Sequence, residues 1–417
     1  MIDARIGSGD PGRPIAWISA AIGLVGLAAT LWAIAGSIGH PFGLNWIEGE
    51  ILDAIAHVQD GGDLFVQPSL TFTPHIYGPL YFHLVGWLTE PIGLDFWNAR
   101  MIGAFGSAGA AAAAAAIAFR LSGSRAAAIA GAGFFAGSFA LSDGWMHLAR
   151  VDGLFIGFFC VAAAMLFRGG RRAAIVGGLL LGLAFFIKQT ALPWGAPILI
   201  AAILIHRRDG LIAAATAILV GAAGAAWLSS VSDGWSDYYM YHLPGGHPPV
   251  ADMIGAYWVT DVAFPLACGL ALCLLGLADA WRRDRAAALF GGLLLIGALG
   301  SGFAGRLHSG GEENVLMPLH FVVAALAAGF APAIARRIAA SLPSAEWRVV
   351  ATLAPALLIG GQAAAAAFDP RAFIPTTADE RAGRALEAAI MAVPGAVWVP
   401  EHGFLARRLG KPAQAPT

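Results

Sequence analysis

Two carboxylates that follow the first apolar run are the residues of this chain best placed to do chemistry. Glu48 and Glu50 come shortly after residues 16–38, in a sequence where only 12% of residues are charged. Desolvating an ionisable group at a membrane boundary is costly, so acids placed there are candidates for function. Such an acid could accept a proton as a general base. The alternative is that it only stabilises the start of a helix.

A second set of ionisable residues precedes the apolar run at residues 152–167. Asp152 opens this run and Arg150 lies two positions earlier, so the two could bind a ligand together or simply pair with each other. Asp143 and His147 are four residues apart, a spacing that on a helix would let both hold a divalent metal. We expect no cofactor to be required, with a divalent metal as an option at Asp143 and His147.

Cations and amides interrupt the apolar sequence at two further places. Lys188 and Gln189 separate two apolar runs, where a cation suits the phosphate of a lipid-linked ligand. The alternative is that Lys188 only extends its amino group to the membrane surface. Residues 305–314, GRLHSGGEEN, include a glycine pair whose backbone amides can approach an anion. The other candidates for substrate binding lie in polar, aromatic or glycine-rich segments: Glu50, Tyr77, His242, Arg306, His308, Glu312 and Asn314.

The composition indicates that membrane-spanning helices position these residues. Hydrophobic residues make up 58% of the 417 residues, against about 45–50% in soluble domains. The net charge of −1 gives no electrostatic basis for binding nucleic acid. Three cysteines lie inside apolar runs, which predicts buried free thiols: Cys160, Cys268 and Cys273.

The apolar runs predict an all-α polytopic membrane protein. A span needs about 20 apolar residues, although some runs here are shorter. Basic residues fall in alternate loops, and the positive-inside rule places those loops in the cytoplasm. Residues 76–89 are apolar but short, so we expect them to form an interfacial or re-entrant helix in the first outer loop. The eleven expected spans are residues 16–38, 98–119, 126–142, 152–167, 173–187, 190–205, 211–230, 258–278, 286–304, 315–335 and 349–367.

The chain is expected to divide into a membrane domain with a short polar segment at each end. Within the C-terminal segment we expect an amphipathic helix at residues 378–391 and a strand at residues 396–400. About fifty residues bury little core on their own, so this segment is expected to dock onto the membrane domain. The regions are a cytoplasmic N-terminus at 1–15, the membrane domain at 16–367 with its first periplasmic loop at 40–97, and a periplasmic segment at 368–417.

Short motifs in the first outer loop resemble those of the GT-C superfamily of membrane glycosyltransferases. Residues 47–50 read Ile-Glu-Gly-Glu, residues 77–81 read Tyr-Gly-Pro-Leu-Tyr, and residues 98–100 read Asn-Ala-Arg. The likeness is to family-39-like bacterial proteins, which are related to protein O-mannosyltransferases and to the aminoarabinose transferase of lipid A. It extends over residues 16–335. Glu48 matches the acidic motif of that loop, with Ile47 where a strict Asp-Glu pair would begin.

The resemblance implies an inverting glycosyltransferase that works at the outer face of a bacterial inner membrane. Its donor would be a polyprenyl-phosphate-linked sugar, its acceptor a lipid, glycan or protein, and its surroundings membrane lipids. Glu48 would be the base, and Asp152 the second carboxylate, holding the acceptor or a metal. The leaving phosphate would be stabilised by cations, for which the candidates are Arg150, Lys188 and Arg306.

Three other classes of protein stay open at this point. A transporter or flippase would carry polar residues along its spans and an internal repeat, and the spans here are nearly without charge. An O-antigen polymerase or ligase would depend on arginines and a histidine of its outer loops. A non-catalytic membrane scaffold would tolerate the loss of the Glu48 and Asp152 carboxylates.

Overall fold

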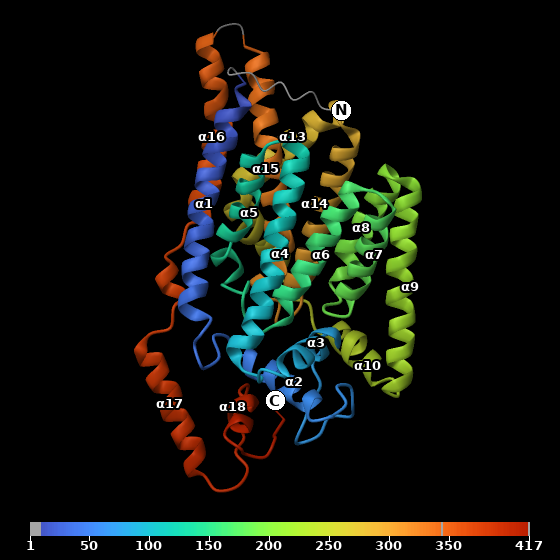
Figure 1. The fold of residues 1–417 in the computed structure, drawn as a ribbon, viewed down its shortest axis with the longest axis vertical. Helices are drawn as coiled ribbons and strands as arrows, with labels where there is room; N and C mark the ends of the chain where they lie inside the picture. The colour runs from blue at the N-terminus through green and yellow to red at the C-terminus, as the bar shows by residue number, and fades with distance from the viewer. Residues whose placement is uncertain (1–9, 343–344, 416–417) are drawn as a thin grey trace.

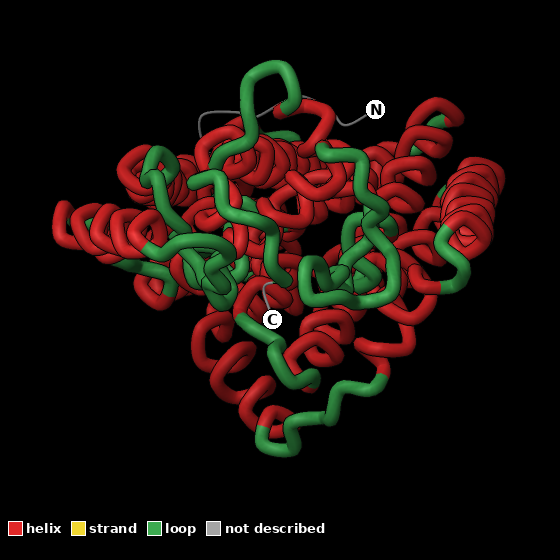
Figure 2. Tube along the Cα trace, turned by 90° about the horizontal axis from the view of Figure 1, so that it is seen from below, coloured by secondary structure: helices red, strands yellow, loops and turns green. Residues whose placement is uncertain are grey.

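The computed structural model describes residues 10–342 and 345–415, in which helices and their connections make up the chain and no strand is present (Figures 1 and 2). The long helices run roughly side by side. They are α1 (Gly12–Ser37), α4 (Phe96–Ser122), α5 (Arg125–Gly137), α6 (Val151–Arg168), α7 (Arg171–Phe185), α8 (Ala191–Ile205), α9 (Arg207–Val231), α13 (Phe264–Arg283), α14 (Arg285–Leu307), α15 (Met317–Ala340) and α16 (Ala345–Ala365).

Each of the eleven apolar runs coincides with one of these helices. Seven helical stretches are long and apolar enough to cross a membrane, counted over the described residues. Helices α5, α7 and α8 are shorter, at 13, 15 and 15 residues. The all-α, multi-pass fold class is therefore confirmed, while the count of eleven crossings stays a prediction.

Helix α15 forms the centre of the bundle and packs against α1, α4, α5, α13, α14 and α16. In its most apolar window, 94% of the residues are buried. Around it, the helices approach closely through small residues, which is how apolar helices associate where no water drives them together. Gly103 and Gly106 of α4 lie against the backbone of Gly153 and Gly157 of α6. This contact holds the N-terminal halves of α4 and α6 side by side.

The connections are concentrated at one end of the bundle, here called the α2 end (bottom of Figure 1, facing the viewer in Figure 2). Helix α3 has only ten residues and packs on α2, and its interfacial or re-entrant placement stays a prediction. The short elements are α2 (Glu48–Gln59), α3 (Leu80–Thr89), η1 (Ala140–Ser142), α10 (Trp235–Asp237), η2 (Tyr238–His242), α11 (Leu243–Gly245), α12 (Met253–Ala256), η3 (Tyr257–Ala263), η4 (Glu313–Leu316), η5 (Pro370–Phe373), α17 (Thr377–Ala392) and α18 (Gly403–Arg408).

The C-terminal segment differs in part from the expectation. The predicted helix is confirmed as α17, which begins with a capping box between Thr376 and Asp379. The predicted strand at residues 396–400 is wrong, because no neighbouring strand edge is available there; the Trp398 indole instead donates to the Ala415 carbonyl, at 2.9 Å. The three cysteines are free thiols, as predicted, with Cys160 and Cys273 buried and Cys268 half-buried.

Candidate active site

Glu48, the first residue of α2, is held by four hydrogen-bond donors. Arg100 of α4 donates from Nε to Oε1 at 3.0 Å and from Nη2 to Oε2 at 2.8 Å. The backbone amides of Ala149 and Leu44 each donate at 2.7 Å. A carboxylate offers about four acceptor positions, so none is left for a ligand. Both side chains of the pair are fully buried.

These contacts give Glu48 a structural setting unlike that of a base. Burial raises the pKa of Glu48, but the Arg100 charge and the four hydrogen bonds outweigh it and hold the pKa below its usual value. Arg100 also donates to the carbonyls of His40 and Phe42, both at 2.6 Å. The pair thus ties together the segment after α1, the start of α2, helix α4 and the loop before α6.

Glu50 lies two residues further along α2 and has the opposite properties. Its side chain is 5% exposed, and its Oε1 atom has no hydrogen-bond partner within the described part of the chain. Burial raises the pKa of Glu50 to about 7, with a further increase from the negative charge of Glu401 and a partial decrease from Arg150. Glu50 is therefore a buried carboxylate that can exchange a proton near neutral pH.

Asp152 lies at the start of α6, where three distant segments converge. Its Oδ1 accepts from Lys188 Nζ at 2.6 Å, just after α7, and from Asn314 Nδ2 at 2.8 Å, in η4. Its Oδ2 forms an ion pair with Arg150 Nε at 3.4 Å that does not have the alignment of a hydrogen bond. The structure thus brings together four of the residues singled out in the sequence.

Arg150 connects the Asp152 cluster to the first loop. Its guanidinium donates to Asn45 Oδ1 at 2.9 Å and to the Tyr77 hydroxyl at 3.1 Å, and it stacks 3.9 Å above the Trp145 ring. Gln189, next to Lys188, uses its amide group structurally. It donates to the carbonyls of Ile76 and Met240, at 2.6 and 3.1 Å, and so holds the Tyr77 turn against η2.

Four buried polar atoms in this region lack a hydrogen-bond partner among the described residues. They belong to Glu50 (Oε1), Tyr81 (Oη), Arg150 (Nε) and Asp152 (Oδ2). Burial and the nearby acids, Glu48 and Asp152, raise the pKa of Tyr81, so its hydroxyl stays a proton donor. Buried polar atoms nearly always have partners, and several without one in a single place indicate a site that a ligand completes. These four residues with Lys188 and Asn314 are here called the polar centre.

Other residues singled out in the sequence make no hydrogen bond to the polar centre within the described chain. Arg306 donates to Asp261 at 2.8 Å and to the Gly311 carbonyl at 2.6 Å, and lies 3.3 Å from Glu313. These contacts tie its guanidinium to η3 and to the loop that follows α14. His242, His308 and Glu312 are exposed.

Asp143 and His147 lie in a loop and not on a helix, so the spacing that would pair them around a metal is not formed. His147 is buried, Nε2 is 2.9 Å from the Ser37 hydroxyl, and burial lowers its pKa to about 4. No group of three or more metal-ligating side chains occurs in the described residues. Both residues line a polar cavity of about 420 Å³ together with Asn45.

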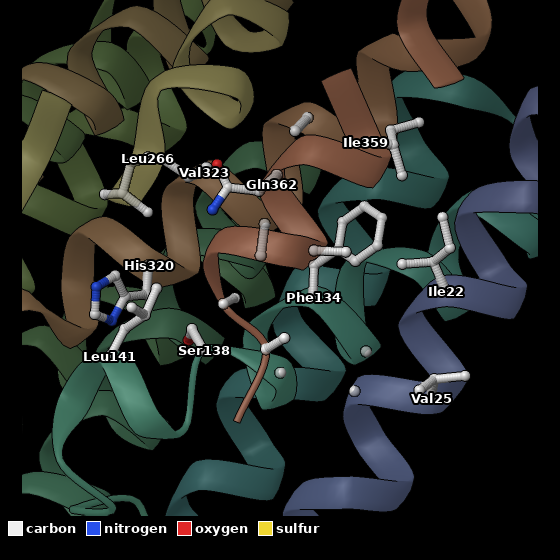
Figure 3. A pocket seen from close by; sticks show the side chains of 18 of the residues that line it. Ile22, Val25, Phe134, Ser138, Leu141, Leu266, His320, Val323, Ile359 and Gln362 are labelled. Atoms are coloured by element: carbon white, nitrogen blue, oxygen red, sulfur yellow. The ribbon is translucent and has the colours of Figure 1, made fainter. Parts of the chain in front are cut away.

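Two apolar cavities lie among the long helices. One, of about 280 Å³, is lined by α1, α5, α13, α15 and α16, and Figure 3 shows His320 and Gln362 among its apolar side chains. No residue of the polar centre lines it. The other is a groove of about 560 Å³ along α7, α8 and α9 that reaches Tyr241, and it is here called the lateral groove. Exposed side chains such as Leu192 and Ile218 border it, so it opens to the side of the bundle.

Sequence reasoning gave no site role to Arg100, Asn45, Tyr81 or Glu401. A signal for Arg100 exists, because it is the one charged residue between Trp97 and Phe119 and a span tolerates an arginine only with a partner. Tyr81 belongs to the Tyr-Gly-Pro-Leu-Tyr motif. Glu401 carries no such signal, since only the tertiary fold places it near α2.

Comparison with known proteins identifies the fold. No family model and no curated protein matches the chain. Among solved structures, ArnT from Cupriavidus metallidurans in the apo state matches with a TM-score of 0.64 and 14% identity, over 95% of this chain and 84% of that one. The same protein bound to undecaprenyl phosphate matches with a TM-score of 0.61, 14% identity and coverage of 95% and 85%.

A third similar structure is the apo oligosaccharyltransferase of Archaeoglobus fulgidus. Its TM-score is 0.52 at 12% identity, over 89% of this chain and 58% of that one. At identities this low, the comparisons establish a shared fold. The GT-C-like fold expected from the sequence is confirmed.

Proposed function

We propose that this protein is a membrane glycosyltransferase whose donor is a sugar linked to a polyprenyl phosphate. The observation that carries the proposal is the polar centre, where two acids, an arginine and a tyrosine leave buried polar atoms open. A phosphate oxygen suits Arg150, and a sugar or acceptor hydroxyl suits Glu50 and Asp152. The GT-C fold supports the reaction class, and the complex of ArnT with undecaprenyl phosphate supports the donor class.

The donor would place its phosphate at the polar centre and its apolar chain in the lateral groove. Tyr241 lines the groove and is followed back along the chain by Met240, whose carbonyl accepts a hydrogen bond from Gln189. Gln189 in turn adjoins Lys188, which is proposed to face the phosphate together with Arg150. A chain lying in the groove therefore leads towards Lys188. Cations there would stabilise the charge that develops on the phosphate as it leaves.

Glu50, and not Glu48, is the proposed base. Glu48 has all its acceptor positions filled and a lowered pKa, whereas Glu50 has a free oxygen and a pKa of about 7, close to the optimum for a base at neutral pH. Glu50 takes the proton of the acceptor hydroxyl while the oxygen of that hydroxyl attacks the anomeric carbon of the donor sugar. The bond from that carbon to the phosphate oxygen breaks, and the polyprenyl phosphate leaves. One displacement inverts the anomeric centre.

Asp152 is proposed to serve as the second carboxylate. Oδ1 holds Lys188 and Asn314 in place, and Oδ2, which is ion-paired with Arg150 but accepts no hydrogen bond, would hold the acceptor hydroxyl or a divalent metal. The acceptor can be a lipid, glycan or protein. The positive-inside pattern supports a periplasmic position for the α2 end, because Arg120, Arg168 and Arg283 all lie at helix ends facing away from it.

The test compares Glu50→Gln with wild type in a deletion strain, by analysis of its lipids and glycans. We expect the variant to form product at least about 100-fold more slowly, as for loss of a general base. Wild-type product formation in membranes should increase with pH through about 7, because Glu50 must be ionised to accept a proton. The purified variant should still bind undecaprenyl phosphate in native mass spectrometry.

Two results would contradict the proposal. Full restoration of the product by Glu50→Gln would remove Glu50 as the base. Movement of a lipid-linked sugar across vesicles by the wild-type protein, with the sugar left on its lipid, would identify a transporter instead.

A further inference from the structure

The residues after α17 return to the polar centre and fasten onto α2. Arg407 of α18 donates from Nε to Asp53 Oδ1 at 2.6 Å and from Nη1 to Asp60 Oδ2 at 2.7 Å. Asp53 is only 2% exposed, so the first of these ion pairs is shielded from water. The Ala415 amide donates to the Leu70 carbonyl at 2.9 Å, which fixes the end of the segment on the first loop.

Glycines let the two backbones meet between these anchors. A Cβ atom on Gly49 of α2 would lie 2.9 Å from the Glu401 carbonyl oxygen and 3.0 Å from His402 Cα. A Cβ atom on Gly403 would lie 3.3 Å from the Asp53 carboxyl group. Glu401 and His402 are therefore in direct contact with the turn of α2 that carries Glu50.

The backbone of Glu401 is in a conformation that needs support. Its φ of 63° lies in the left-handed region, which costs a residue with a side chain about 1–2 kcal/mol. Such conformations persist where the surrounding structure holds them, and they are common at functional sites. Here the Arg407 ion pairs and the contact with Gly49 supply that support.

We propose that residues 399–411 are part of the active site, where they clamp α2 and set Glu401 beside Glu50 as a positioning residue for the base. The role of Glu50 as a base rests on the proposed function. The charged groups that act on Glu50 are Glu401 and Asp53, which oppose its ionisation, and Arg150, which favours it. Together these effects keep Glu50 able to hold and release a proton near neutral pH.

The test measures the titration of Glu50 directly, without sugar transfer. In full-length protein in lipid nanodiscs, the protonated carboxyl band in infrared difference spectra is followed against pH and assigned by its loss in Glu50→Gln. Glu401→Gln should move the midpoint of that band down by about 1 pH unit, the effect of removing one nearby negative charge. Glu380→Gln, on the exposed face of α17, is the matched control and should leave the midpoint unchanged.

A second variant separates the clamp from the charge. Gly49→Ala keeps both glutamates but pushes the Glu401–His402 backbone away, so it should also lower the midpoint. An unchanged midpoint in Glu401→Gln overturns the proposal. A shifted midpoint in a protein that transfers no sugar would leave the clamp in place and reject the proposed function instead.

Discussion

At the scale of single residues, the two glutamates of the first loop should respond in opposite ways to the same change. Glu48→Gln puts an NH2 group opposite a backbone N–H and leaves Arg100 buried without a full charge partner. Breaking a buried ion pair in this way costs about 3–5 kcal/mol of folding stability. We therefore expect a marked decrease in the thermal unfolding temperature of the purified protein in detergent.

Glu50→Gln is the matched comparison, because it removes a carboxylate that has no ion pair. The pKa of Glu50 is about 7 when folded and near 4.5 when unfolded, so the stability it contributes is complete below pH 4.5 and decreases as pH increases through about 7. The glutamine variant lacks this decrease and should be at least as stable as wild type at pH 8. A stability loss equal to that of Glu48→Gln would contradict the separate roles.

The sequence could indicate a functional residue where the signal is local, but it could not indicate a role that depends on partners far away along the chain. A carboxylate next to an apolar run can be recognised from the sequence alone, so both glutamates could be identified as candidates. Their separate roles depend on partners far away: Arg100 is 52 residues from Glu48, and Glu401 reaches Glu50 only through the docked C-terminal segment. The convergence of Asp152, Lys188 and Asn314 likewise needs the packing of α6, α7 and α15.

At the scale of elements, the contact between α4 and α6 should control the geometry of the site. Arg100 and Asp152 lie on these two helices, next to the glycines at which the backbones meet. Gly153→Ala would place a methyl group against the backbone of Gly103 and separate the helices. Overpacking of this kind costs about 1–3 kcal/mol, and we expect transfer activity to decrease with it.

Gly109→Ala, on the α4 side of the same helix pair, is the control for this change. A Cβ atom there would have neighbours only at 3.8 and 3.9 Å, an ordinary van der Waals distance. Unfolding temperature and product formation should both stay near wild type. If Gly109→Ala and Gly153→Ala behave alike, the close approach of α4 and α6 does not position the site.

Local sequence was a good guide to the long helices and a poor one to the C-terminal segment. An apolar run in a membrane has to satisfy its backbone hydrogen bonds internally, so each run became a helix without any tertiary information. The strand expected at residues 396–400 needed a partner edge, and none exists in the described chain. The capped helix α17 could be found because Thr376 and Asp379 are local signals.

At the scale of the whole molecule, the lateral groove and the polar centre should act as one binding site for a long lipid phosphate. Gly221 of α9 lines the groove, and a Cβ atom there would meet no atom within 4 Å. Gly221→Leu would therefore fill part of the groove without disturbing its walls. We expect it to weaken binding of undecaprenyl phosphate, measured by native mass spectrometry, while binding of a phosphate on a much shorter prenyl chain changes less.

The control for the groove is Gly292→Leu on α14, which also has open space around its Cα and does not line the groove. Each buried CH₂ group of a chain contributes about 0.8 kcal/mol, so losing the contacts of even two or three such groups lowers affinity by more than tenfold. That loss should appear for Gly221→Leu and be absent for Gly292→Leu. Equal affinity in both variants would place the lipid chain elsewhere, because a chain in the lateral groove cannot avoid a leucine at position 221.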